Sequence, residues 1–275
     1  MKSYSFIWLI LFSLLTTACK SNDEPTTGFD VFSKKVDVFG VVVYATADTP
    51  DDKVLHAAAV LAEYLDNDED GVPDNQYVVN EMVSRNASLV MFKDEDAEAR
   101  RHFFVGGWHE GRAVQDLYGA ETHPNGAARG IFDASLEEVL HLVTFGGYAY
   151  TYPDVFGERS GTAVAKALDI ARGGHFEEVP DRYPENAWFT YYDETCDYSC
   201  QITEYMYWAL PSILGAQDFP GRLERIQEEW RLNTREKVMT GDPAIYTLLT
   251  DPQYKFATVL PDGNYTGGAI EIQKF

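Results

Sequence analysis

The sequence predicts an α+β fold, with a small N-terminal sheet and a mainly helical C-terminal half. The sheet is indicated by a continuous run of β-branched and aromatic residues at 36–46, VDVFGVVVYAT. The helical half is indicated by apolar residues that recur at intervals of three and four in several later segments. A hydrophobic fraction of 45% and an aromatic fraction of 14% are sufficient for a globular core.

The other elements follow in chain order from capping residues and apolar spacing. Thr49 is a good helix cap and Pro50 a good first helical residue, so a helix is expected from there to about Leu65. Further helices are expected at 76–85, 94–100, 133–148, 161–172, 201–215, 221–240 and 244–250, and further strands at 88–92 and 102–105. Residues 115–125 are expected to form a polar loop, and residues 252–275 a series of turns.

Residues 1–18 are predicted to be an export signal. Lys2 gives a positive start, and residues 6–15 form an apolar segment too short to span a bilayer. Residues 15–19, LTTAC, resemble a bacterial lipobox, which implies cleavage before Cys19 and its lipidation. Residues 19–28 would form a tether whose acidic start resembles that of surface lipoproteins in the Bacteroidetes group. The expected location is the bacterial outer membrane or cell surface, with a lipid anchor in the membrane. An ordinary secretory signal is the alternative.

Residues 29–275 are predicted to form a single domain, because no Gly/Ser-rich or Pro-rich run and no internal repeat interrupts them. The net charge of −22 argues against nucleic acid and anionic membrane surfaces as partners. The same charge is compatible with the binding of divalent cations.

An acidic segment at 66–77 has the pattern of an EF-hand-type calcium loop. Acids alternate along it and Gly71 stands at the sharp turn. The predicted Ca²⁺ ligands are Asp66, Asp68, Asp70, the Val72 carbonyl and Asp74. Tyr77 replaces the glutamate that usually closes such a loop, so Glu81 or water must complete the shell. The alternative is a solvated acidic turn.

The helix expected at 133–148 organises the functional prediction. Leu136, Val139, Leu140 and Val143 form its apolar stripe, and Gly146 and Gly147 are expected to end it. At about 100° per residue, Glu137 and His141 lie about 40° apart around the axis. Glu138 lies about 60° from His141, on its other side.

This arrangement resembles the H-E-x-x-H helix of zincin metallopeptidases, specifically the gluzincins, with a glutamate in the first position. The resemblance implies a zincin-like fold in which Glu137 and His141 bind Zn²⁺ and Glu138 is the catalytic base. Glu204, in the later segment TEYMYWA, would be the third ligand. One imidazole and two carboxylates make a harder donor set than usual, so Mn²⁺ or Ca²⁺ is an alternative ion. Ser135 and Glu138 also fit a capping box, and Glu137 and His141 fit a helix-surface pair.

Three further residues are candidates for stabilising an oxyanion, namely His123, Tyr205 and Tyr207. Cys196 and Cys200 are expected to form a disulfide in an exported protein, just before the helix that carries Glu204. A zinc–thiolate pair is the alternative.

The leading functional prediction is a surface-anchored, metal-dependent hydrolase that acts on peptides through metal-activated water. A non-catalytic calcium-binding lipoprotein that binds glycan or protein is the first alternative. A glycoside hydrolase with Glu138 and Glu204 as paired carboxylates is the second.

Overall fold

The structure is a computed structural model that describes residues 28–105, 109 and 111–275. The predicted signal peptide, the lipidation site at Cys19 and the tether up to residue 27 lie outside the described residues. No helix in the described part is long and apolar enough to cross a membrane.

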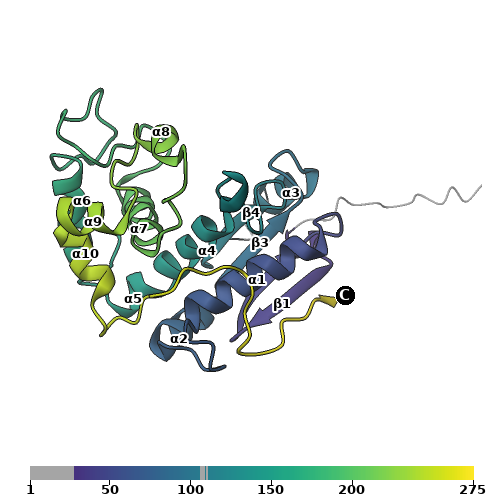
Figure 1. Cartoon of the computed structure of the whole chain (residues 1–275). Helices are drawn as coiled ribbons and strands as arrows, with labels where there is room; N and C mark the ends of the chain where they lie inside the picture. The colour runs from purple at the N-terminus through teal and green to yellow at the C-terminus, as the bar shows by residue number, and fades with distance from the viewer. Residues whose placement is uncertain (1–27, 106–108, 110) are drawn as a thin grey trace, which may run out of the picture.

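A five-stranded mixed sheet occupies the N-terminal part and confirms the predicted α+β class (Figure 1). Its strands, in chain order, are β1 (Lys34–Val38), β2 (Val41–Ala45), β3 (Ser88–Phe92), β4 (Val114–Tyr118) and β5 (Gln273–Lys274). Their spatial order is β4-β3-β2-β1-β5. β2, β3 and β4 are parallel, whereas β1 is antiparallel to both of its neighbours. β4 is therefore an edge strand.

The expected single strand at 36–46 is wrong, because the chain reverses within it. Phe39 and Gly40 have φ values of 54° and 89°, and they turn β1 into β2. Glycine tolerates this left-handed conformation, and a two-residue turn of this kind matches the twist of an antiparallel hairpin. The apolar run at 36–46 gave no indication of this turn in the sequence pattern.

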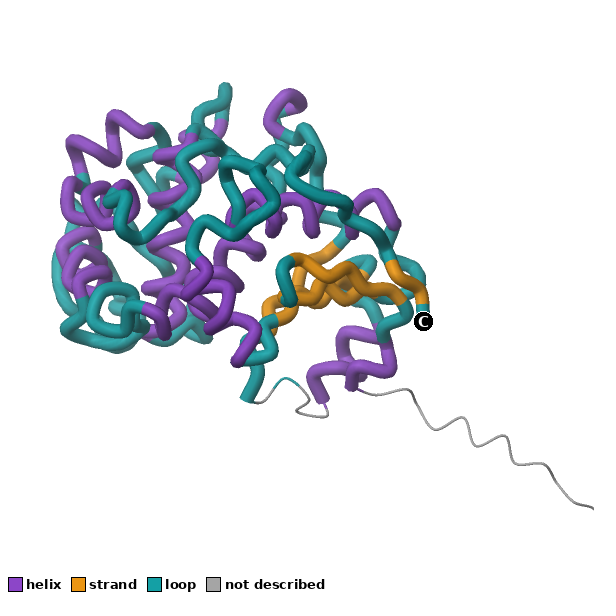
Figure 2. The backbone as a smooth tube through the Cα atoms, turned by 90° about the horizontal axis from the view of Figure 1, so that it is seen from below, coloured by secondary structure: helices purple, strands orange, loops and turns teal. Residues whose placement is uncertain are grey.

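Helices cover both faces of the sheet (Figure 2). α1 (Asp51–Leu65) and α4 (Ser135–Val143) share one buried apolar cluster with inward-facing residues of β1, β2, β3 and β4. On the other face, η1 (Gly28–Val31) and α3 (Glu98–Val105) enclose an aromatic cluster that includes Phe32, Phe92 and Phe103.

The strand expected at 102–105 is wrong, since these residues end α3. The loop expected at 115–125 is wrong in its first part, which belongs to β4.

The glycines at 146 and 147 do not end the organising helix. After α4 the chain continues as a short π-helix, η3 (Thr144–Tyr148), and then as α5 (Ala149–Thr151). A Cβ atom at Gly147 would lie 2.7 Å from Val78 Cγ1, on the neighbouring helix α2 (Gln76–Ser84). Gly147 therefore permits close packing of two segments rather than a helix stop.

The C-terminal half is mainly helical, as predicted. It contains α6 (Ala163–Ala171), α7 (Tyr198–Leu214), α8 (Arg222–Ile226), α9 (Arg235–Gly241) and α10 (Pro243–Thr250). The long helix expected at 221–240 is wrong, because it is divided into α8 and α9. Between them Trp230 is completely buried and donates from Nε1 to Ser212 Oγ at 3.0 Å, and Thr234 then caps α9. Burial of this large ring favours an irregular path over a solvated helix.

The last residues return along the sheet half of the molecule (Figure 1). Backbone N–H groups of Gly263 and Asn264 donate to the Glu63 carboxylate on α1, each at 2.9 Å. The chain then ends in β5, beside β1. The C-terminal segment thus joins the helical half to the sheet and to the acidic loop after α1.

Candidate metal centre

The candidate metal centre lies where α4 meets α7. The start of α7 is fixed twice, because Asp197 accepts from Cys200 N at 3.0 Å and Cys196 and Cys200 form a disulfide. The disulfide prediction is confirmed. These restraints set the beginning of the helix whose second turn carries Glu204 toward α4.

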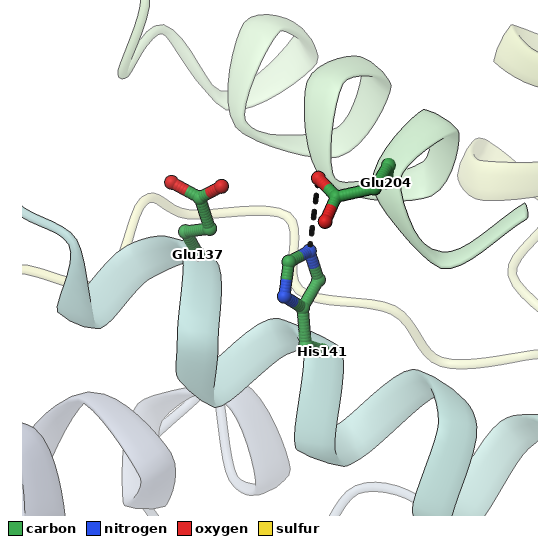
Figure 3. Close-up of side chains that lie close together, drawn as sticks. All are labelled: Glu137, His141 and Glu204. Carbon is green, nitrogen blue, oxygen red and sulfur yellow. Dashed lines mark ion pairs between the residues drawn. The ribbon is translucent and has the colours of Figure 1, made fainter. Parts of the chain in front are cut away.

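Glu137, His141 and Glu204 come together as the resemblance implied (Figure 3). Each offers one ligand atom, and these atoms all lie within 4.8 Å of one another. His141 Nε2 is 3.6 Å from Glu204 Oε2 across the gap between the helices. His141 is only 5% exposed. These three residues could hold a metal ion.

The imidazole of His141 has one nitrogen in use and one free. Nδ1 lies 3.3 Å from Glu138 Oε2, which also accepts from Gln115 Nε2 on β4 at 2.6 Å. Nε2 is buried and has no hydrogen-bond partner among the described residues. In the neutral imidazole, a carboxylate at Nδ1 favours the proton there, so the lone pair of Nε2 would face Glu204, as in metal-binding histidines.

Burial and mutual repulsion perturb the acids of this centre. Burial, with the charges of Glu138 and Glu204, raises the pKa of Glu137 to about 8. Burial raises the pKa of Glu204 as well, and Glu138 adds to the increase. Burial opposes protonation of His141, but Glu204, Glu138 and Glu137 outweigh it and raise its pKa to about 9. A divalent cation bound between these side chains would compensate their negative charge and oppose the increase in the pKa of Glu137.

The structure separates the three residues proposed for an oxyanion. The Tyr207 hydroxyl is close enough to Glu137 to affect its pKa, and it accepts from Arg222 and Gln217 side chains at 3.5 Å each. Tyr205 instead donates to Asp242 Oδ2 at 2.5 Å, within the core. His123 lines a separate cavity of about 200 Å³. Only Tyr207 is adjacent to the candidate ligands.

Sequence reasoning missed three residues that surround the centre. The Tyr191 hydroxyl is near enough to lower the pKa of Glu204, against the effect of burial. Gln115 fixes Glu138, as described above. Glu158 accepts from the hydroxyl of Thr203, next to Glu204, and its charge interacts with His141. Tyr191 belongs to an aromatic stretch visible in the sequence, but nothing in that stretch distinguishes it from its neighbours.

The alternatives based on helix capping receive no support from the geometry. Ser135 Oγ is buried and has no hydrogen-bond partner in the described part of the chain, so it does not cap α4. Glu138 is engaged with Gln115 and His141 instead of the helix start. Asp133 performs part of the capping, since its Oδ1 accepts from Ser135 N at 3.3 Å.

The acidic loop forms a second group of convergent carboxylates. Oxygens of Asp66, Asp68 and Asp70 lie within 4.8 Å of one another. One oxygen of the predicted ligand Asp74 is engaged within the loop, since Asp74 Oδ2 accepts from Asn67 N at 2.7 Å. The three converging aspartates could hold a cation, and the wider ligand set stays a prediction.

The α4–α7 donor set fits a divalent ion. It combines one buried imidazole nitrogen that has no hydrogen-bond partner with two partly buried carboxylates, and a third carboxylate, from Glu138, fixes the opposite nitrogen of the ring. Comparison of the chain with protein-family models, with curated proteins and with solved structures gave no match.

Proposed function

We propose that this protein is a surface lipoprotein that acts as a divalent-metal-dependent hydrolase, most simply a peptidase. The observation that carries the proposal is the buried, unpartnered Nε2 of His141, with Glu137 and Glu204 converging on it. A lone buried imidazole nitrogen is costly unless it has a partner, and a metal ion supplies one.

The residues have distinct roles in the proposed reaction. A divalent ion bound at Glu137, His141 and Glu204 would polarise a scissile carbonyl and lower the pKa of a water molecule. Glu138 uses Oε2 to hold His141, while Oε1 makes no hydrogen bond to the described residues and is available to take the proton of the attacking water. Glu138 then returns this proton to the leaving amine. Tyr207 and Tyr191 approach Glu137 and Glu204 and are the nearest hydroxyl donors for an oxyanion.

This arrangement favours the hydrolase over the two alternatives. In a glycoside hydrolase Glu138 and Glu204 would face each other across a substrate, but here they address opposite nitrogens of the His141 ring. For a calcium-binding lipoprotein without activity, the acidic loop alone would be sufficient. No function would then offset the free-energy cost of burying the polar side chains of the α4–α7 group.

The test is the metal content and peptide hydrolysis of the full chain and its Glu138→Gln variant. Elemental mass spectrometry should give one transition metal per chain in both proteins, because Glu138 does not bind the ion. Hydrolysis of a mixed peptide library should fall by about 100-fold or more in the variant, which is the range for loss of a general base. Glu236→Gln, an exposed glutamate on α9, is the matched control and should hydrolyse normally. Wild-type protein that carries no transition metal would refute the proposal.

A further inference from the structure

We propose that a tyrosine-lined cleft beside the metal centre binds an extended peptide that carries a basic side chain. The cleft has a volume of about 730 Å³ and lies between residues 182–193 and residues 228–231. Tyr183, Tyr191 and Tyr192 line it together with Asp193, Glu228 and Glu229. Peptide binding here is independent of hydrolysis, whereas presentation of the peptide to the metal centre rests on the proposed function.

Tyr191 connects the cleft with the metal centre. It belongs to the cleft wall, and its hydroxyl also acts on the Glu204 carboxylate. Glu229, in the segment that is hydrogen-bonded to Thr190, is close enough for its charge to act on both Tyr191 and Glu204. A ligand that contacts Tyr191 in the cleft is therefore separated from Glu204, which does not itself line the cleft, by this one side chain.

The wall formed by residues 190–193 offers free main-chain groups. Thr190 N donates to Glu229 O at 2.9 Å, and the Tyr183 hydroxyl donates to Tyr191 O at 2.8 Å. The N–H groups of Tyr191, Tyr192 and Asp193 have no hydrogen-bond acceptor among the described residues. Non-helical backbone held in place on one side and unpaired on the other can accept an extended peptide by main-chain hydrogen bonding.

The net negative charge of the cleft favours a basic side chain on the bound peptide. Four carboxylates line it, from Glu185, Asp193, Glu228 and Glu229, against two guanidinium groups, from Arg182 and Arg231, a difference of two negative charges. None of the four carboxylates forms an ion pair in the described part of the protein.

One of the two arginines is partly committed elsewhere, since Arg231 Nη1 donates to Glu185 O at 2.9 Å. Tyr192 is 54% exposed, so its ring is open to a ligand cation. A lysine or arginine side chain would gain both carboxylates and aromatic faces.

The experiment measures binding of a fluorescent peptide by anisotropy, in the Glu138→Gln background so that turnover does not interfere. Two peptides of the same extended sequence differ only at the central residue, which is Lys in one and Glu in the other. The Lys peptide should bind at least about 10-fold more tightly, and the preference should decrease with added salt. Replacing both Glu228 and Glu229 by Gln should reduce it to about 2-fold or less.

The matched control replaces Glu224 and Glu236 by Gln, which removes the same charge from exposed positions outside the cleft. This control should retain the preference, and far-UV circular dichroism should show that all variants are folded. Equal binding of the two peptides, or a preference that survives in the Glu228/Glu229 variant, would overturn the inference.

The outcome for the cleft and the outcome for the enzyme are separable. If the wild-type protein hydrolyses peptides, the same Lys preference should appear in kcat/KM and should be lost in the Glu228/Glu229 variant. If it hydrolyses none, the proposed function fails, yet the anisotropy preference still decides whether the cleft binds basic peptides.

Discussion

The two groups of converging carboxylates differ in what already occupies their oxygens. In the acidic loop, Asp66 accepts from the N–H groups of Asp70 and Gly71 and from the Tyr265 hydroxyl, so the protein itself satisfies this carboxylate. At the α4–α7 contact, by contrast, Nε2 of His141 has no hydrogen-bond partner among the described residues, and Glu137 and Glu204 have raised pKa values. The loop aspartate is thus satisfied by hydrogen bonds within the chain, whereas the α4–α7 group has a buried ring nitrogen without one.

The difference shows which features of a site indicate function. Aspartates at alternating positions of a loop are easily accommodated by turn N–H groups, as the buried Asp66 is, and by water where they are exposed, as Asp68 and Asp70 are. A buried donor atom without a partner is costly, and it is retained where it serves binding or chemistry. For this reason the α4–α7 group supports a proposal more strongly than the loop, although the loop has the more regular sequence pattern.

Removal of the His141 imidazole should have the largest effect, and it tests directly whether the α4–α7 group differs from the acidic loop in binding a transition metal. We expect His141→Ala to weaken transition-metal binding by about 100-fold or more, since it removes the only nitrogen ligand and not just an outer-shell partner. Competition with a metal chelator measures the affinity. His175→Ala is the matched control, because His175 is exposed and lies between Asp169 and Glu177, away from the centre. Full metal content in His141→Ala would exclude the α4–α7 site.

The pH dependence of metal binding provides a smaller but specific test. Without metal, the pKa of Glu137 is about 8 and that of His141 about 9, so both groups carry protons at pH 7. A metal ion binds the deprotonated forms and must displace these protons. Affinity should therefore increase with pH, by about 10-fold per unit for each displaced proton below pH 8.

Calorimetry in two buffers with different ionisation enthalpies counts the protons released. In Glu137→Gln the count at pH 7 should decrease by one relative to wild type. Affinity that is the same at pH 6 and pH 8 would contradict the raised pKa values.

The sequence pattern predicted local structure well where one face of an element is buried. α1, β3 and α7 lie close to their expected positions because capping residues and apolar spacing act within a few residues. The errors occurred where distant contacts override local preference. Trp230 divides the expected helix at 221–240 because its pocket lies against α7, and Gly147 continues a helix because it packs against α2.

The same distinction applies to the metal centre. Helical spacing placed Glu137 and His141 on one side of the helix, whereas their role as ligands and the choice of Glu204 came from the resemblance to a zincin. Gln115 and Tyr191 could not be predicted, because each meets the centre through a contact between separate elements. The role of Glu138 toward His141 Nδ1 is likewise a matter of side-chain direction, which spacing along a helix does not determine.

The smallest expected effects concern the acidic loop, the second of the two compared groups. Calcium should raise the melting temperature of the wild-type protein, and Asp68→Asn should weaken calcium binding by about 10-fold, because ligand charge sets affinity in such loops. Without calcium, Asp68→Asn should be neutral or slightly stabilising, since Asp70 and Asp74 repel Asp68 and help to raise its pKa. Tyr265→Phe removes a hydrogen bond to Asp66 and should cost about 1 kcal/mol without calcium. Thermal unfolding with and without calcium separates the two variants: a calcium shift as large in Asp68→Asn as in the wild type, at a calcium concentration near the wild-type Kd, would mean that Asp68 does not bind the ion.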